Sequence, residues 1–295
     1  MSERRLRDIN KHDAAAASVS REDLKRYDID SIDNRDPHMV GRAMTILEAP
    51  LFRYFRPVIA GLENIEPGPA LFVGNHNSGP LTPDTFTFAI AAYREHGIDA
   101  VPYGLGHEVA IQVPLVHQLL VPLGAVRASH DTAHRLFERG KKVLVYPGGD
   151  LDSWRSHWDR DKVVFGPRRG YIRLALRADV PIVPVVTAGA QETWFVLDDG
   201  QWLAKLLRAD VVFRLKAWPI VFSLPWGLTI GPPLPYVPFR TRIHQEVLSP
   251  IRFERSGDDA AGDDEYVERC HREVVASMQN TLTRLAAERR LAEAS

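Results

Sequence analysis

The sequence predicts an α/β fold in which helices cover a central sheet. Short apolar runs of strand length alternate with helical patterns, and turns rich in glycine and proline separate them. Because strand–helix–strand units recur along the chain, we expect one central sheet with functional loops at the ends of its strands. The expected strands span residues 70–73, 100–104, 143–146, 181–186 and 245–248, and the expected helices span residues 85–96, 132–139 and 170–178.

Capping residues define the helix boundaries. Thr82-Pro83-Asp84 has the pattern of a helix start, with Thr82 as the cap, Pro83 in the first turn, and Asp84 where the helix dipole favours a carboxylate. Gly97 and Gly140 then end the first two expected helices.

The two ends of the chain differ in composition from its middle. Residues 1–34 are rich in charge and alanine and are expected to be loosely ordered or helical, whereas residues 35–255 form the main domain. Within residues 256–295, the acidic stretch 256–264 predicts a flexible loop. The following apolar stripe predicts a helix packed on the body, through Val267, Cys270, Val274, Met278, Leu282 and Leu285.

Composition limits the class of protein. With 295 residues, 45% of them hydrophobic, the chain can bury the core of one large domain or at most two. A net charge of -1 excludes bulk attraction to nucleic acid or anionic lipid, so any membrane contact must come from a local patch. The single cysteine, Cys270, cannot form an internal disulfide. The first residues lack the apolar segment of a secretory signal, no apolar run is long enough for a transmembrane helix, and the histidines lack zinc-site spacing.

The most informative segment is residues 70–84, in which an apolar strand delivers a histidine to a loop. His76 follows the strand, and turn residues lead from it to Asp84. A histidine near a carboxylate is a candidate general base with a candidate orienting acid. The alternative interpretation is an ordinary loop histidine and an ordinary capping aspartate.

A second strand, within residues 142–155, ends in the same way. Two glycines allow backbone N–H groups to approach an anion closely, and an arginine can bind a phosphate or carboxylate with two parallel hydrogen bonds. A simple turn with a solvated charge cluster is the alternative. The residues concerned are Pro147, Gly148, Gly149, Asp150, Asp152 and Arg155.

Together these segments resemble the lysophospholipid acyltransferase superfamily, which includes glycerophosphate acyltransferases and the diacylglycerol acyltransferase branch. The resemblance implies a bacterial-type member whose acyltransferase domain is residues 35–255. It implies a central mixed sheet flanked by helices, with an N-terminal helix and the C-terminal helix packed on the body. Four blocks follow the family order, namely Asn75-His76 with an acid downstream, Pro122-Leu-Gly124-Ala-Val-Arg127, Tyr146-Pro147-Gly148-Gly149 and residues 180–186.

Two departures from the family pattern affect the expected chemistry. The family separates its histidine and aspartate by four residues, but that position is Leu81 here, and the first acid downstream is Asp84. Gly148 stands where glycerophosphate and lysophosphatidate enzymes usually carry glutamate. The Pro-Gly-Gly run looks more like the diacylglycerol and monoacylglycerol acyltransferase branch, although the His-Pro-His-Gly signature of that branch is absent. The acyl acceptor therefore stays open.

The resemblance implies an acyl-CoA-dependent O-acyltransferase of glycerolipid or phospholipid metabolism. We expect His76 to act as general base on a lipid hydroxyl and Asp84 to orient it, without a covalent acyl-enzyme, because the acyl group arrives already activated. No cofactor is expected, and the donor is acyl-CoA or acyl carrier protein. Backbone N–H groups at Gly148 and Gly149 could hold the oxyanion or a phosphate. The expected substrate-binding residues are Asn75, Arg127, Gly148, Gly149, Asp150, Asp152, Arg155, Arg168 and Arg169.

Such an enzyme is expected to be cytoplasmic and peripheral on the inner face of the membrane. Residues 39–59 mix aromatic, aliphatic and basic residues at helical spacing, and residues 202–226 predict an amphipathic hairpin that contains Trp202, Trp218 and Trp226. Ordinary helices packed on the core are the alternative for both segments.

Two other functions remain open from the sequence. A hydrolase could use the same pocket with water in place of the alcohol, although the Gly-x-Ser-x-Gly elbow of serine esterases is absent. A catalytically weak lipid-binding relative is the other alternative, because Leu81 replaces the family aspartate.

Overall fold

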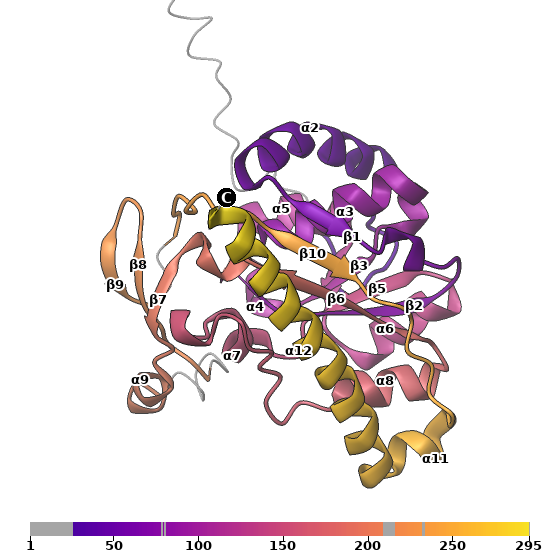
Figure 1. Cartoon of the computed structure of the whole chain (residues 1–295). Helices are drawn as coiled ribbons and strands as arrows, with labels where there is room; N and C mark the ends of the chain where they lie inside the picture. Colours follow the sequence, from indigo (N-terminus) through magenta and orange to yellow (C-terminus); the bar gives the residue numbers. More distant parts are fainter. Residues whose placement is uncertain (1–25, 78, 80, 209–215, 232–233, 295) are drawn as a thin grey trace, which may run out of the picture.

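The apolar runs form a seven-stranded mixed sheet in the structure, which is a computed structural model (Figure 1). The structure describes residues 26–77, 79, 81–208, 216–231 and 234–294. Neighbouring strands pair in parallel except β10 and β6, which pair antiparallel. The strand order is β1 (Val58–Ala60), β10 (His244–Val247), β6 (Ile182–Ala188), β2 (Ala70–Gly74), β5 (Lys142–Val145), β3 (Tyr103–Gly106) and β4 (Ala125–Arg127).

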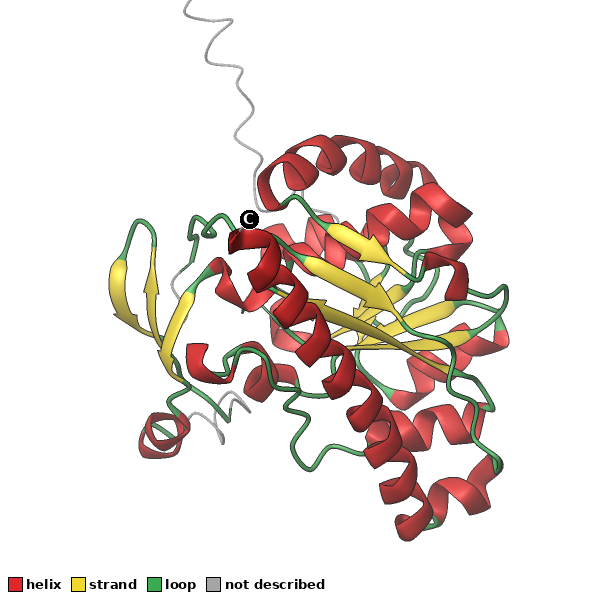
Figure 2. Cartoon of the chain, viewed as in Figure 1, coloured by secondary structure: helices red, strands yellow, loops and turns green. Residues whose placement is uncertain are grey.

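Helices cover both faces of this sheet (Figure 2). Alternate residues of a strand point to opposite faces, and β2 is buried on both. Leu71 and Val73 pack with α6 (His130–Glu138), α8 (Gly170–Ala178) and α12 (Asp264–Ala294). Phe72 packs on the other face against Phe88 of α3 (Pro83–His96), and α2 (Pro37–Phe55) packs on α3. The predicted fold class, with an N-terminal and a C-terminal helix on the body, is confirmed.

Shorter elements connect these layers. Among the described residues, none of the helices is both long and apolar enough to cross a membrane. The remaining elements are α4 (Glu108–Ile111), α5 (Pro114–Leu123), α7 (Gly149–Ser153), α9 (Gln201–Leu206), α11 (Gly257–Gly262), and the 3-10 helices η1 (Leu62–Asn64), η2 (Ile98–Ala100), η3 (His157–Asp159) and η4 (Ala190–Thr193).

Two predicted elements differ from the structure. The strand expected at residues 100–104 begins only at Tyr103, because Pro102 has no N–H to donate to a ladder. The flexible acidic loop expected at 256–264 contains the short helix α11, which packs on α8 through the buried Ala260 and Ala261. By contrast, α8 spans residues 170–178 as predicted, and the predicted apolar stripe of the C-terminal helix is entirely buried.

The N-terminal prediction lies largely outside the described residues. Of the expected region 1–34, the structure describes residues 26–34, which form turns in which Ile29 and Ile32 are buried. The division of the chain into residues 1–34, 35–255 and 256–295 stays a prediction.

A second, antiparallel sheet projects from the body beside α7 (Figure 1). Its strand order is β7 (Phe195–Asp198), β8 (Ile220–Ser223) and β9 (Gly227–Ile230). Its inner face joins a cluster that contains Trp154 and Trp194. The predicted hairpin within residues 202–226 corresponds to part of this sheet, although residues 209–215 lie outside the described residues.

Candidate active site

The loop that carries His76 lies at the carboxyl edge of the central sheet. Strands β2, β5 and β6 are adjacent and parallel, so the loops that follow them meet at one edge. β2 leads to residues 75–77, β5 leads to Tyr146 and α7, and β6 leads to η4. The two loops that the sequence singles out are therefore neighbours in space.

The ring of Tyr146 packs against the imidazole of His76. A Cβ atom on Gly74 would lie 2.4 Å from Cε1 of Tyr146, so only glycine permits this close approach at the end of β2. The rings of Tyr146 and His76 lie with centroids 4.7 Å apart. The Tyr146 hydroxyl shares a hydrogen bond of 2.6 Å with Oγ1 of Thr85, which ties this support to α3.

A buried ion pair holds the backbone of His76 from two sides. Asp152 accepts a hydrogen bond from the His76 N–H at 2.5 Å, and Arg155 donates one to the His76 carbonyl oxygen at 2.6 Å. Arg155 Nη1 also lies 3.1 Å from Asp152 Oδ1, and the exposed fractions of the two side chains are 3% and 0%. We call Asp152 and Arg155 the His76 clamp. Because both clamp residues are buried and bonded internally, they position His76 instead of offering free groups to a substrate.

Asn77 joins this clamp to Asp84. Its Nδ2 donates to Asp84 Oδ2 at 2.9 Å, and its Oδ1 accepts from Arg155 Nη2 at 2.5 Å. In the described part of the chain, which includes both residues, no hydrogen bond or ion pair joins the side chains of His76 and Asp84. The direct contact that the sequence predicts is therefore not formed, and Asn77 is the hydrogen-bonded link between Asp84 and the His76 loop.

The environment of His76 favours a neutral imidazole. Burial lowers the pKa of His76 from 6.5 to about 4, and the Arg155 charge acts in the same direction, while a hydrogen bond to Asn77 opposes both. Nδ1 lies 3.2 Å from the Asn77 carbonyl oxygen. A carbonyl only accepts hydrogen bonds, so Nδ1 carries the proton and Nε2 keeps its lone pair.

Asp84 is a buried carboxyl group whose ionised form is unfavourable. It is 2% exposed, and its Oδ1 has no hydrogen-bond partner among the described residues. Burial raises the pKa of Asp84 from 3.8 to about 6, although hydrogen bonds, first of all from Asn77, oppose the shift. An ionised Asp84 therefore destabilises the folded state above pH 6.

We expect the Asp84→Asn variant to show this penalty as a pH-dependent difference in stability. The folded-state pKa is raised, so the penalty is present above about pH 6 and is lost as the pH falls towards the unfolded value of 3.8. Relative to wild type, the variant should gain about 3 kcal/mol in free energy of unfolding at pH 8 compared with pH 4. Urea titrations across this range measure the difference.

The matched control for this measurement is Asp258→Asn, because the Asp258 side chain is 92% exposed and solvent screens its charge. A stability difference for Asp84→Asn that does not change with pH would contradict the assignment.

Three other predicted binding residues have structural partners. Asn75 is 1% exposed, and its amide exchanges two hydrogen bonds of 2.9 Å with the backbone of Thr187 in β6. The Gly149 N–H donates to the Tyr146 carbonyl oxygen at 3.0 Å, so it is not available to an oxyanion. A Cβ on Gly148 would lie 2.2 Å from Cβ of Asp152, so this glycine is required for the clamp to pack.

The remaining charged residues of the prediction form ion pairs. Arg168 bonds Asp150 at 2.6 Å and also donates to the Gly148 carbonyl oxygen. Arg127 pairs with Asp30 at 2.5 Å at the end of β4, and Arg169 pairs with Glu268 of α12 at 2.6 Å. Of these arginines, Arg168 lies nearest the glycine turn, whereas Arg169 lies on the face covered by α12.

The residue that sequence reasoning missed is Asn77. It follows the motif histidine among turn residues and reads as part of a turn, yet it is 1% exposed and connects both sides of the site. The only signal in the sequence is the symmetric Asn-His-Asn triplet at 75–77.

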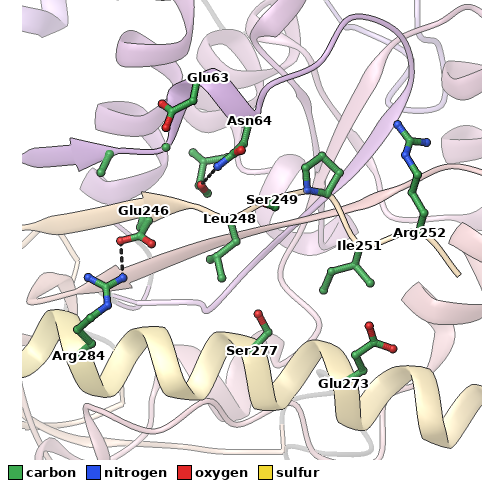
Figure 3. Close-up of a pocket in the computed structure, with 14 residues that line it drawn as sticks. Glu63, Asn64, Glu246, Leu248, Ser249, Ile251, Arg252, Glu273, Ser277 and Arg284 are labelled. Atoms are coloured by element: carbon green, nitrogen blue, oxygen red, sulfur yellow. Dashed lines mark hydrogen bonds and ion pairs between the residues drawn. The ribbon is translucent and has the colours of Figure 1, made fainter.

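An open groove with a volume of about 910 Å³ lies elsewhere on the molecule (Figure 3). Its lining includes Ser249, Arg252 and Glu273, and the Glu246–Arg284 ion pair crosses it. The antiparallel register places the end of β10 beside the amino-terminal half of β6, away from the carboxyl edge that carries His76. The groove is therefore separate from the candidate site.

Residues 56–188 match the family model described as Acyltransferase. This range contains β2, β5, the His76 loop and the clamp. The part of the chain that carries the candidate site is therefore similar to acyltransferases. No group of His, Cys, Asp and Glu side chains that could hold a metal ion occurs among the residues that the structure describes.

Particular relatives cover different parts of the chain. An uncharacterized protein of Mycobacterium tuberculosis is 29% identical over 280 residues, which are 94% of this chain and 75% of that protein. A chicken (Gallus gallus) protein described as a DGAT1/2-independent enzyme synthesizing storage lipids is 25% identical over 181 residues, 60% of this chain and 52% of that protein. The crystal structure of the 1-acyl-sn-glycerophosphate acyltransferase PlsC from Thermotoga maritima superposes with a TM-score of 0.47 at 16% identity, covering 84% and 83% of the two chains.

Proposed function

We propose that this protein transfers a fatty acyl group from acyl-CoA, or from acyl carrier protein, to a hydroxyl of a glycerolipid or related lipid. The observation that carries the proposal is the held, neutral imidazole of His76, with Nδ1 directed at the Asn77 carbonyl oxygen. The name of the chicken relative, which synthesises storage lipids, supports a lipid acceptor.

The proposed reaction needs no covalent intermediate. His76 Nε2 accepts the proton of the acceptor hydroxyl while the oxygen attacks the thioester carbonyl carbon. The carbon–sulfur bond then breaks, and the leaving thiolate takes the proton back from the imidazolium. The products are a lipid ester and a free thiol. Tyr146 and the His76 clamp hold the imidazole in position throughout.

Partly exposed arginines supply the proposed phosphate contacts. Arg168 is the best placed, because it already borders the Gly148 turn and its side chain is 32% exposed. Arg127 lies at the same edge of the sheet, and the ion pair that it forms with Asp30 is open to solvent. A phosphate could replace either carboxylate partner, and at Arg127 it could keep the bidentate geometry of the Asp30 pair.

We further propose that the protein works peripherally at the inner face of the cytoplasmic membrane, since its acceptor is a membrane lipid. Asp84 acts in this proposal as a positioning residue through Asn77, not as a direct partner of His76.

Incubation of the purified chain with radiolabelled acyl-CoA and a panel of acceptors tests the function. The panel contains lysophosphatidate, monoacylglycerol, diacylglycerol and no acceptor. A labelled lipid ester with one of the three is the expected product. Labelled free fatty acid in every reaction would favour the hydrolase alternative, and neither product would favour a lipid-binding relative without catalysis; both outcomes would overturn the proposal.

A further inference from the structure

The outward face of the β8–β9 hairpin is exposed to solvent, yet its side chains are apolar. The register pairs Ile220 with Ile230 and Phe222 with Leu228, so these four side chains share one face, which we call the hairpin face. Phe222, Leu228 and Ile230 are 43%, 65% and 69% exposed. The opposite face is already used, because Val221 is fully buried in the cluster with Trp154. An antiparallel sheet with one solvated face normally carries polar residues there.

Neighbouring segments extend this apolar surface. Trp226, at the turn of the hairpin, is 53% exposed, and its indole N–H donates to the Pro235 carbonyl oxygen at 2.5 Å. The ring can therefore enter an apolar phase without leaving its polar atom unpaired. On α9, Trp202 and Leu206 point outward one turn apart, while Leu203 and Ala204 face the body. Figure 1 shows α9 and the hairpin at the same end of the molecule.

Charge distinguishes this end of the molecule from the rest of the chain. Among the described residues between 201 and 237, Lys205, Arg208 and Lys216 are basic and none is acidic, in a chain whose net charge is -1. Exposed tryptophans and aliphatic residues together with lysines and arginines are the composition of surfaces that bind anionic lipid interfaces.

The other predicted membrane segment does not offer such a face. The helix expected within residues 39–59 exists as α2, but its apolar residues Val40, Met44 and Leu47 pack against α3 and its neighbours. Trp218, the third tryptophan of the predicted hairpin, is partly buried and lies against Gly231. Of the two predicted membrane segments, the structure therefore favours the one that contains the hairpin and α9.

This surface is also continuous with the candidate active site. The buried side of the small sheet packs on Leu151 of α7, next to the clamp residue Asp152. A Cβ on Gly79, in the His76 loop, would lie 2.1 Å from the ring of Trp194, which belongs to the same cluster. The cluster behind the hairpin face therefore packs on both loops that surround His76.

We propose that the hairpin face, together with Trp202 and Leu206 of α9, docks on an anionic lipid bilayer and brings the His76 loop to the membrane surface. This inference rests on the proposed lipid acceptor. It names the partner as a bilayer, which delivers the acceptor lipid at the edge of the small sheet.

Flotation of the purified full chain with vesicles of equal parts phosphatidylcholine and phosphatidylglycerol tests the docking surface. The double variant Leu228→Ser/Ile230→Ser is expected to reduce the vesicle-bound fraction at least about tenfold, because two exposed aliphatic side chains no longer enter the interface. The variant Lys205→Gln/Arg208→Gln is expected to weaken binding to these vesicles but not to pure phosphatidylcholine.

The matched control is Ile46→Ser/Leu291→Ser, which makes the same chemical changes at residues that are 65% and 72% exposed elsewhere on the surface. It should bind as wild type does. Equal flotation of the hairpin variant and wild type, or no flotation of wild type, would overturn the proposal. So would a wild-type dimer that the hairpin variant converts to a monomer with unchanged vesicle binding, because the hairpin face would then be a self-association surface.

His76→Asn separates this inference from the proposed function. It should float as wild type does, because it leaves the docking surface intact. The hairpin variant should in turn retain transfer to an acceptor dispersed in detergent. A wild-type protein that floats through its hairpin but transfers no acyl group would refute the proposed function and leave the docking surface in place.

Discussion

Replacing His76 by asparagine is expected to lower kcat for acyl transfer by at least about 100-fold, because a positioned general base typically contributes about 10²- to 10⁴-fold. Asparagine keeps a donor that can reach the Asn77 carbonyl oxygen, so the loop should keep its conformation. Single-turnover and steady-state assays with whichever acceptor of the panel yields a lipid ester measure the loss.

A control histidine separates this effect from a general perturbation. His134 lies on α6 with half of its side chain exposed, so His134→Asn should retain wild-type kcat. Near-wild-type transfer by His76→Asn would remove His76 from the mechanism.

The pH profile provides a second measurement on the same residue. Because burial lowers the pKa of His76 to about 4, the imidazole is neutral and able to accept a proton from about pH 5 upwards. Activity dependent on this group should therefore not decline between pH 7.5 and 6, as it would for a histidine with the ordinary value of 6.5. A decline centred near pH 6.5 that persists in the Asp84→Asn variant would show that the imidazole titrates in a solvated environment.

Removing Arg155 is expected to have the largest effect on stability. Arg155→Met leaves the Asp152 carboxylate buried without its partner, and breaking a buried pair in this way typically costs about 3–5 kcal/mol. Arg177→Ala is the matched control, because its ion pair with Asp258 is open to solvent and should contribute less than about 1 kcal/mol. Urea unfolding of the two variants measures both values.

Two further variants show whether the clamp acts as an ion pair or as a backbone support. The double variant Asp152→Leu/Arg155→Met removes both charges, which would restore stability if the pair mattered only as a pair of charges. We expect no restoration, because Asp152 also accepts hydrogen bonds from the backbone N–H groups of His76 and Val164. Arg155→Lys retains the charge but not the several donors, so it should fold and still lose kcat. Wild-type kcat in Arg155→Lys would contradict the positioning role.

The fold followed from local patterns to a large extent. Helix α8 and the buried stripe of α12 could be predicted because apolar periodicity and capping act over a few residues. The predicted start of β3 was too early, because Pro102 precedes the first residue of the strand. Helix α11 was not predicted, because its formation depends on packing its two alanines against α8. Such contacts are made with residues far along the chain, which local patterns do not report.

The candidate site, too, could be predicted only in part from the sequence. His76 and its neighbouring glycine turn were recognisable from the order of the family blocks, but the partners of the charged side chains were not. Arg155 looked like an anion-binding residue, and the structure places it on the carbonyl oxygen of His76, 79 positions earlier in the chain. Asp84 looked like a direct partner of His76, and Asn77 occupies its Oδ2 instead.

The sequence by itself therefore indicated the resemblance to acyltransferases, the main strands and helices of the central sheet, and the histidine at the end of the second strand. Periodicity, capping and motif order are all encoded within short segments, so they can be read without coordinates. Only the tertiary structure decided that Asp152 and Arg155 hold His76. It also decided that the apolar residues of α2 pack against α3, whereas the apolar face of the β8–β9 hairpin stays exposed. These outcomes depend on which buried charges find partners and which apolar faces find cover when distant segments come together.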